Sequence, residues 1–200
     1  MPKLKPLLAY PYYRVRGYRP VKVAPSRWDE EFRAGKWDYL ADLAQTGCYS
    51  IVFSYCQELG PEAILDVGCG PGTLVRSIRV LGYKHYLGID VSPEAIARAE
   101  RAYRDERTEF LTADAEAFHP RQAFDLIVFN NSLYYMAKPD AVIRRYARHL
   151  NPGGRIAVAM TDGGLGQAVW RLIEKELAVE HWLRVVQADG GATTKLLRPQ

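Results

Sequence analysis

The chain has few of the residues that build metal sites and disulfides. Its 200 residues include only three cysteines and four histidines. Cys48, Cys56 and Cys69 are an odd number at scattered positions, and their spacing matches neither a disulfide framework nor a cysteine-bound metal. So few cysteines are typical of a protein from a reducing compartment, and we expect a cytoplasmic location.

Long apolar runs are also missing. Prolines at positions 2, 6, 11 and 20 interrupt the N-terminal region, so we expect neither a signal peptide nor a membrane span. The sequence has no internal repeat, and 200 residues at 48% hydrophobic content suffice for one buried domain but not for two of ordinary size. We therefore predict an N-terminal arm and helical cap over residues 1–60 and a core over residues 61–200, forming a single domain.

Positive charge is concentrated at the N-terminus. Seven lysines and arginines precede Trp28 with no acidic residue among them, and tyrosines including Tyr18 are interleaved with them. Such a segment can contact a nucleic acid or an anionic surface. The alternative, which we favour, is that its tyrosines pack on the domain or close over a bound ligand.

The most informative stretch covers residues 63–73, which read AILDVGCGPGT. Its apolar beginning predicts a buried strand, its glycines allow a tight turn, and the apolar residues that follow recur at helical spacing. About twenty residues later a second apolar segment ends at Asp90. A carboxylate in this place can accept both hydroxyl groups of a ribose, so the pattern indicates an adenosine-containing ligand.

The glycine spacing indicates which ligand. A dinucleotide-binding turn has a third glycine that lets the helix pack closely, and here that position is Thr73. The glycines present are Gly68, Gly70 and Gly72, preceded by Asp66, which suits a ligand with no pyrophosphate and with a cationic amino-acid tail. This turn resembles the first motif of the Rossmann-like, class I S-adenosylmethionine-dependent methyltransferases.

Three further motifs follow in the order found in that family. Residues 112–116 resemble its adenine-binding stretch, residues 124–130 its fourth strand, and residues 150–156 its L-x-P-G-G turn. The resemblance covers residues 62–160 and implies S-adenosylmethionine as cofactor and S-adenosylhomocysteine as product. The cofactor-binding residues that it implies are Asp66, Gly68, Cys69, Gly70, Gly72, Asp90, Val91, Asp114, Ala115 and Asn130.

Alternating strand and helix patterns predict an α/β fold. Helices are expected over residues 37–45, from residue 49, from Pro93 after a Ser92 cap, and over residues 139–149 and 165–178. The last strands are expected over residues 181–188 and 193–197, joined by a short glycine turn that implies antiparallel pairing. This arrangement resembles the seven-stranded, mostly parallel sheet of the Rossmann-like methyltransferases, which implies helices on both faces and an antiparallel last strand.

Catalytic side chains should lie beyond the carboxyl ends of the parallel strands. The four histidines are all predicted at the opposite edge of the sheet. The catalytic candidates are Tyr134, Tyr135 and Asp162, where a base is needed only if the acceptor must lose a proton. An aromatic cap for the acceptor is expected from Tyr18, Trp28, Trp37 and Tyr39.

The end of the fourth strand narrows the choice of acceptor. Residues 130–134 lack the two consecutive prolines with which methyltransferases of nucleic-acid amino groups stack a flipped base. This strand end also lacks the carboxylate that a metal-assisted reaction would use. We therefore expect metal-independent transfer to an oxygen, nitrogen or carbon atom of a small organic molecule rather than a nucleic acid. The sequence gives no oligomeric state.

Two other readings stay open. The chain can be a protein that keeps the cofactor pocket without methylating, either as a partner subunit or in another sulfonium-assisted reaction. Tyr134 and Lys138 also form the Y-x-x-x-K pair of short-chain NAD(P)-dependent oxidoreductases. That pair needs a continuous helix, and Pro139 biases the preceding lysine away from helical angles.

Overall fold

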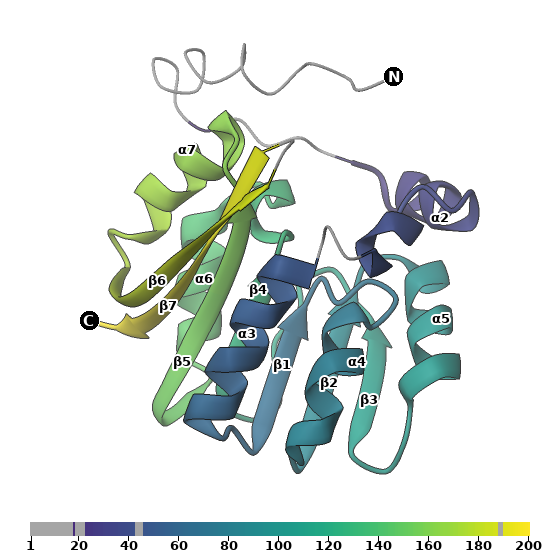
Figure 1. The fold of residues 1–200 in the computed structure, drawn as a ribbon, viewed down its shortest axis with the longest axis horizontal. Helices are drawn as coiled ribbons and strands as arrows, with labels where there is room; N and C mark the ends of the chain where they lie inside the picture. Colours follow the sequence, from purple (N-terminus) through teal and green to yellow (C-terminus); the bar gives the residue numbers. More distant parts are fainter. Residues whose placement is uncertain (1–17, 19–22, 43–45, 188–189) are drawn as a thin grey trace.

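The protein is built around one seven-stranded sheet with the strand order β3-β2-β1-β4-β5-β7-β6 (Figure 1). The computed structural model describes residues 18, 23–42, 46–187 and 190–200. The strands are β1 (Ala63–Val67), β2 (His85–Asp90), β3 (Thr108–Thr112), β4 (Phe124–Asn130), β5 (Leu150–Thr161), β6 (Leu177–Gln187) and β7 (Gly190–Pro199).

The first five strands all pair in parallel, with β1 between β2 and β4. Strand β7 runs antiparallel to both of its neighbours, β5 and β6. The predicted fold class, including the antiparallel last strand, is therefore confirmed.

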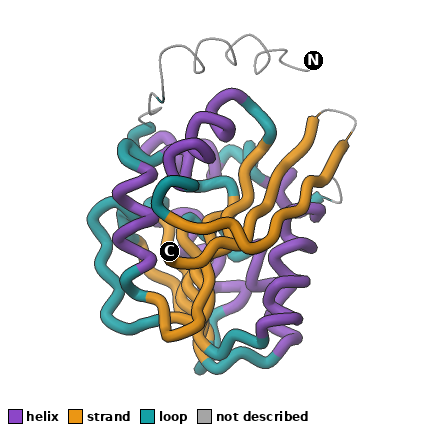
Figure 2. Tube along the Cα trace, turned by 90° about the vertical axis from the view of Figure 1, so that its left-hand side faces the viewer, coloured by secondary structure: helices purple, strands orange, loops and turns teal. Residues whose placement is uncertain are grey.

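Helices cover both faces of the sheet (Figure 2). Residues of α3 (Thr46–Leu59), α4 (Thr73–Ile78) and α5 (Pro93–Tyr103) share one apolar core with the sheet. Residues of α6 (Pro139–Ala147) and α7 (Gly164–Ile173) build the core on the other face. Helix α2 (Pro25–Arg33) packs against α5. The described residues also form the short 3-10 helices η1 (Asp38–Ala41), η3 (Arg79–Leu81) and η4 (Leu133–Tyr135). No helix within the described ranges is both long and apolar enough to cross a membrane.

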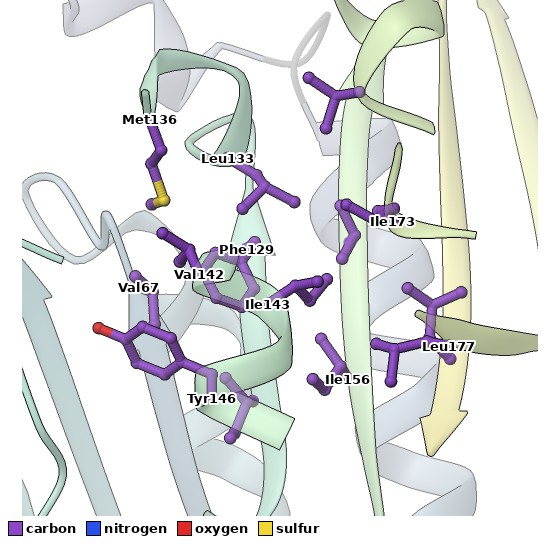
Figure 3. Packing of buried hydrophobic residues seen from close by; sticks show 14 of the residues in the cluster. Val67, Phe129, Leu133, Met136, Val142, Ile143, Tyr146, Ile156, Ile173 and Leu177 are labelled. Atoms are coloured by element: carbon purple, nitrogen blue, oxygen red, sulfur yellow. The ribbon is translucent and has the colours of Figure 1, made fainter. Parts of the chain in front are cut away.

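The central strands are buried on both sides, as expected for a parallel sheet between two helix layers. Leu126 and Val128 of β4 face α3 and α4, while Ile127 and Phe129 face α6 and α7. Figure 3 shows Tyr146 of α6 beside Phe129 in the second of these cores, and their ring centroids lie 5.4 Å apart. This rigid centre fixes the positions of the loops that follow β1, β2 and β4.

Helix α5 begins as its sequence predicts. Ser92 is the N-cap residue, and its hydroxyl accepts a hydrogen bond from the Ala95 N–H at 3.2 Å. Pro93 occupies the first turn, where its missing N–H costs nothing. The cap directly follows Asp90, so the helix start and the candidate ribose ligand are fixed together.

The N-terminal helices differ from the prediction. Helix α2 was not expected, and of the helix predicted over residues 37–45 the described part forms only the 3-10 turn η1. The φ of Gly35 is +69°, which ends the first helix just before Trp37. The missed signals were Pro25 at the first helical position and the aromatic pair Trp28 and Phe32 at helical spacing.

The C-terminal boundaries also need correction. Helix α7 ends at Ile173 rather than near residue 178, and β6 begins at Leu177 rather than at 181. Leu177 is four residues after Ile173, so its burial fits a helical pattern as well as a strand. In the structure Leu177 pairs with Pro199, because β7 is long enough to offer a partner to the whole of β6.

Candidate functional site

A cavity of about 760 Å³ opens beyond the carboxyl ends of the parallel strands. The predicted site residues that line it are Trp28, Trp37, Tyr39, Gly68, Cys69, Gly70, Asp90, Val91, Asp114, Ala115, Asn130, Tyr134 and Tyr135. The predicted residues Tyr18, Asp66, Gly72 and Asp162 are not among the lining residues. Most of the candidate site is thus brought together around one space.

The glycine turn after β1 is held tightly against its neighbours. The N–H groups of Gly68 and Cys69 both donate to the Ile89 carbonyl, at 2.8 and 3.0 Å. Gly68 has a φ of +79°, and a Cβ added to it would lie only 2.4 Å from the Cβ of Ser132. The Ser132 hydroxyl in turn donates to the Val67 carbonyl at 2.6 Å. Only glycine fits where the ends of β1 and β4 approach so closely.

Asp90 at the end of β2 is fixed by two backbone groups. Its Oδ2 accepts from the Gly70 N–H and its Oδ1 from the Ser92 N–H, both at 2.9 Å. Burial raises the pKa of this carboxyl, and these hydrogen bonds oppose the rise. Each carboxylate oxygen has a second lone pair, so the group can still accept from the two hydroxyls of a ribose.

Two buried polar groups beside the glycine turn have unused capacity. Asp66 is 1% exposed, its Oδ2 accepts from the Tyr86 hydroxyl at 2.6 Å, and its Oδ1 has no partner among the described groups. Burial raises the pKa of this carboxyl to about 7. The Nδ2 donor of Asn130 is likewise buried without a partner in the described part of the chain. An acceptor and a donor of this kind suit the ammonium and carboxylate of an amino-acid tail.

The loop after β3 is held in place from α6. The guanidinium of Arg145 donates to the carbonyls of Ala115 and Glu116, at 2.5 and 2.6 Å, and the Tyr146 hydroxyl donates to Ala115 at 3.1 Å. Within the loop, Asp114 Oδ1 accepts from the Glu116 N–H at 2.8 Å. Sequence reasoning missed Arg145, because its contact with the loop joins residues that are 30 positions apart in the sequence.

Aromatic rings form the other wall of the cavity. This aromatic wall consists of Trp28, Phe32, Trp37, Tyr39, Tyr134 and Tyr135, which all line the space. Trp28 packs edge-on against Tyr135 with the ring centroids 4.9 Å apart, and in a tilted arrangement against Trp37 at 5.4 Å. The wall therefore joins the N-terminal cap to the loop after β4.

Three contacts outside the cavity fasten the cap to the core. The Tyr18 hydroxyl lies 2.8 Å from the Tyr134 carbonyl and 2.5 Å from the Met136 carbonyl, to which it donates. Asp29 of α2 accepts from Ser92 and Glu94 at the start of α5. Arg98 of α5 donates to the Phe32 carbonyl at 2.8 Å. Tyr18 thus holds the N-terminal segment against the loop after β4. The basic arm that precedes Tyr18 lies outside the described residues.

The three catalytic candidates divide into two groups. Tyr134 and Tyr135 line the cavity with ring centroids 4.6 Å apart, and burial raises the pKa of both phenols. Asp162 instead accepts from Arg184 at 2.6 Å and from the Thr193 hydroxyl at 2.8 Å, on the β6–β7 side of the sheet. Its neighbour Thr161 lines the cavity in its place.

No histidine lines the cavity in the described structure. His181 Nδ1 lies 3.0 Å from the Tyr55 hydroxyl, and His85 lies beside Gln122 at the amino end of β2. The described residues also contain no group of three His, Cys, Asp or Glu side chains placed to hold a metal ion.

The strand order, with a glycine turn after β1 and a carboxylate at the end of β2, defines a Rossmann-like fold. Residues 64–154 match the family described as "Methyltransferase domain". This match confirms the predicted resemblance to the Rossmann-like, S-adenosylmethionine-dependent methyltransferases and the cofactor of that class.

Known relatives support the same class. A trans-aconitate 2-methyltransferase of Klebsiella pneumoniae is 33% identical over 122 residues, covering 60% of this chain and 47% of the relative. A 27-O-demethylrifamycin SV methyltransferase of Amycolatopsis mediterranei is 32% identical over 139 residues, covering 66% and 51%. The chain thus spans about half the length of these curated relatives.

A solved structure shows the same fold. The N-methyltransferase NodS of Bradyrhizobium japonicum, in complex with S-adenosyl-L-homocysteine, superposes with a TM-score of 0.70 and 21% sequence identity. The match covers 82% of this chain and 91% of that one. At this level of identity the likeness concerns the fold.

Proposed function

We propose that the protein binds S-adenosylmethionine in the cavity and transfers its methyl group to a small organic acceptor. The observation that carries the proposal is the arrangement of Asp90, whose two oxygens are oriented by Gly70 and Ser92 at the end of β2. A carboxylate held in this way beside a glycine turn suits a ribose. The names of the two curated relatives, which refer to trans-aconitate and a rifamycin, support an acceptor of small size.

The other roles follow from the geometry around Asp90. We assign the adenine to the loop with Asp114 and Ala115, which Arg145 holds from behind. We assign the amino-acid tail to the region of Asp66 and Asn130, because a buried oxygen and a buried amide donor there have unused capacity. These assignments agree with the cofactor residues expected from the sequence, including Gly68, Cys69, Gly70 and Val91.

When bound, the cofactor supplies a methyl group already activated by a sulfonium charge. The chain then has to orient the acceptor, exclude water and hold the reacting atoms in line, and such alignment can contribute about 7–11 kcal/mol. The aromatic wall closes the acceptor side of the cavity and is the part of the chain placed to do this. Tyr134 and Tyr135 contact the acceptor in this proposal, whereas Asp162 is left out because its carboxylate is paired with Arg184.

Calorimetry tests the proposal directly. We expect the purified protein to bind S-adenosylmethionine and S-adenosylhomocysteine and not NADH, which would exclude the oxidoreductase reading. Asp90→Asn should weaken binding about 10- to 150-fold, since hydrogen bonds to a charged group contribute about 1.5–3 kcal/mol. Asp42→Asn, on an exposed aspartate, is the matched control. Equal affinity of the Asp90 variant and the wild type would refute the ribose assignment.

A second measurement separates methyl transfer from a cofactor pocket used in another way. Candidate acceptors are incubated with the protein and S-adenosylmethionine, and mass spectrometry follows the gain of one methyl group together with release of S-adenosylhomocysteine. A protein that binds the cofactor tightly and releases no S-adenosylhomocysteine with any acceptor would be the non-methylating alternative.

A further inference from the structure

The charges around the cavity are of one sign. The charged side chains among its described lining residues are Asp90, Asp114 and Glu116, and none of these described residues is a lysine, arginine or histidine. Two described cations near the cavity are engaged elsewhere, since Arg98 pairs with Glu94 and Asp38, and Arg145 binds backbone carbonyls. A carboxylate or phosphate that enters such a space loses water without gaining a cationic partner from the described lining, which is costly.

The lining of the acceptor side favours an aromatic molecule. Trp28, Trp37 and Tyr135 are in ring contact with one another, with centroid distances of 5.4 Å between the tilted tryptophans and 4.9 Å from Trp28 to the edge-on Tyr135. Aromatic rings prefer offset or edge-on contact with another ring, and each such pair adds stability beyond area burial. A planar aromatic molecule can make these contacts on entering the cavity.

Among the described residues, the acceptor side offers no group that readily takes up a proton. The ionisable side chains described there are the phenols of Tyr39, Tyr49, Tyr134 and Tyr135. Burial raises the pKa of all four, so these groups stay protonated near neutral pH. Of the carboxylates that line the cavity, those of Asp90 and Asp114 belong to the proposed ribose and adenine sites, and that of Glu116 accepts from the Ala137 N–H at 3.0 Å. A hydroxyl acceptor, which reacts as its anion, would find no base here.

We propose that the acceptor is a planar aromatic amine without a carboxylate or phosphate, methylated on its uncharged nitrogen. This inference rests on the proposed methyltransferase function. The nitrogen lone pair forms the new bond to the methyl carbon, the carbon–sulfur bond breaks, and its electron pair returns to sulfur, which becomes a neutral thioether. The positive charge passes to the nitrogen, which releases its proton to water afterwards. Asn131 and Thr161 line this side and supply oxygen atoms that can accept from the amine N–H groups.

Three matched probes test the inference. They share a quinoline ring and carry an amino, a hydroxyl or a carboxylate group at the same position. With saturating S-adenosylmethionine we expect the amine to be methylated at least about tenfold faster than the other two. Its rate should stay level between about pH 7 and pH 9, because no proton has to leave before the methyl group is transferred.

A pair of tryptophan variants tests the site. In protein saturated with S-adenosylhomocysteine, Trp37→Leu should weaken binding of the aminoquinoline about threefold to tenfold. Trp182→Leu is the control, because Trp182 is 58% exposed on β6 and does not line the cavity. Measuring in saturated protein separates acceptor binding from any change in cofactor affinity.

Three results would overturn the inference while leaving methyl transfer intact. The first is faster methylation of the hydroxyl or carboxylate probe than of the amine probe. The second is failure of all three probes to bind the protein saturated with S-adenosylhomocysteine. The third is equal affinity of Trp37→Leu and Trp182→Leu for the aminoquinoline. Failure of S-adenosylhomocysteine itself to bind would instead count against the proposed function.

Discussion

The Asp29 carboxylate of α2 accepts hydrogen bonds from the Ser92 hydroxyl at 2.5 Å and from the Glu94 N–H at 3.1 Å. Ser92 also donates its own N–H to Asp90, the residue assigned to the ribose. One short segment after β2 therefore holds both the cap and the cofactor carboxylate. Because α2 carries Trp28 and Phe32, the position of the aromatic wall depends on this contact.

Asp29→Ala should loosen α2 without disturbing the sheet. It removes two hydrogen bonds to a charged acceptor, which contribute on the order of 1.5–3 kcal/mol. Amide hydrogen exchange should therefore become faster over residues 25–33 and stay unchanged in β1 and β4. Glu30→Ala, on an exposed residue of the same helix, is the control. Exchange in α2 that is equally slow in both variants would show that Asp29 does not hold the cap.

Gly68→Ala should abolish cofactor binding by moving the glycine turn. Its added Cβ would lie 2.4 Å from the Cβ of Ser132, a contact that the backbone has to relieve. Gly60→Ala is a matched control, because Gly60 also has a positive φ, of +56°, but has nothing within 4 Å of its added Cβ. The control carries the backbone strain alone, of order 1–3 kcal/mol, and should still bind S-adenosylhomocysteine. Equal affinity of Gly68→Ala and Gly60→Ala for S-adenosylhomocysteine in calorimetry would contradict the steric explanation.

Binding of S-adenosylmethionine should release a proton from Asp66. The pKa of this carboxyl is raised to about 7 by burial, so at pH 6.5 most of it is protonated. The ammonium group that we place nearby favours the carboxylate and lowers the pKa. Calorimetry at pH 6.5 in buffers of different ionisation enthalpy should detect the release, and Asp66→Asn should lack it. Identical proton release by the variant would place the amino-acid tail elsewhere.

The same carboxyl predicts how stability depends on pH. In the unfolded chain its pKa returns to about 3.9, so between about pH 4 and pH 7 the folded state holds a proton that the unfolded state has lost. The contribution of Asp66 to the free energy of unfolding should therefore fall as pH rises through this window. Asp66→Asn should remove this contribution and make the protein without cofactor more stable at pH 8, by a few kcal/mol at most. Chemical denaturation at pH 5 and pH 8 checks the difference, and parallel changes in both proteins would contradict it.

The sequence predicted the parts of the fold that depend on local chemistry. Ser92 and Pro93 mark the start of α5 because a side-chain cap and a fixed φ act within a few residues. The turn at Gly68 and the carboxylate of Asp90 could be found because both belong to contiguous motifs. Parallel strands then bring such motifs to one edge of the sheet, so most of the proposed cofactor site follows from the sequence.

Residues that act across long separations were missed. Asp29 reaches Ser92 from 63 positions away, and Arg145 reaches Ala115 from 30 positions away. No local pattern distinguishes these side chains from the solvated charges around them. The start of β6 was missed for a similar reason, because pairing of Leu177 with Pro199 decides it. The pairing of Asp162 with Arg184 also joins residues far apart in the sequence, and it removes Asp162 from the proposed catalytic residues.

Arg145→Lys should weaken cofactor binding although Arg145 does not line the cavity. The guanidinium reaches two successive carbonyls, of Ala115 and Glu116, and a single ammonium group cannot reproduce this two-pronged contact. Losing one such hydrogen bond should cost on the order of 1–2 kcal/mol, which lowers the affinity for S-adenosylhomocysteine about fivefold to thirtyfold.

The neighbouring Arg144→Lys is the control for this change. Arg144 lies on the same helix but pairs with Asp140 and Glu176 at the surface, so this variant should bind like the wild type. Thermal unfolding of both variants separates a local effect on the loop from a general loss of stability. If Arg145→Lys lowered the unfolding temperature but kept its affinity for S-adenosylhomocysteine, Arg145 would stabilise the fold without positioning the adenine loop.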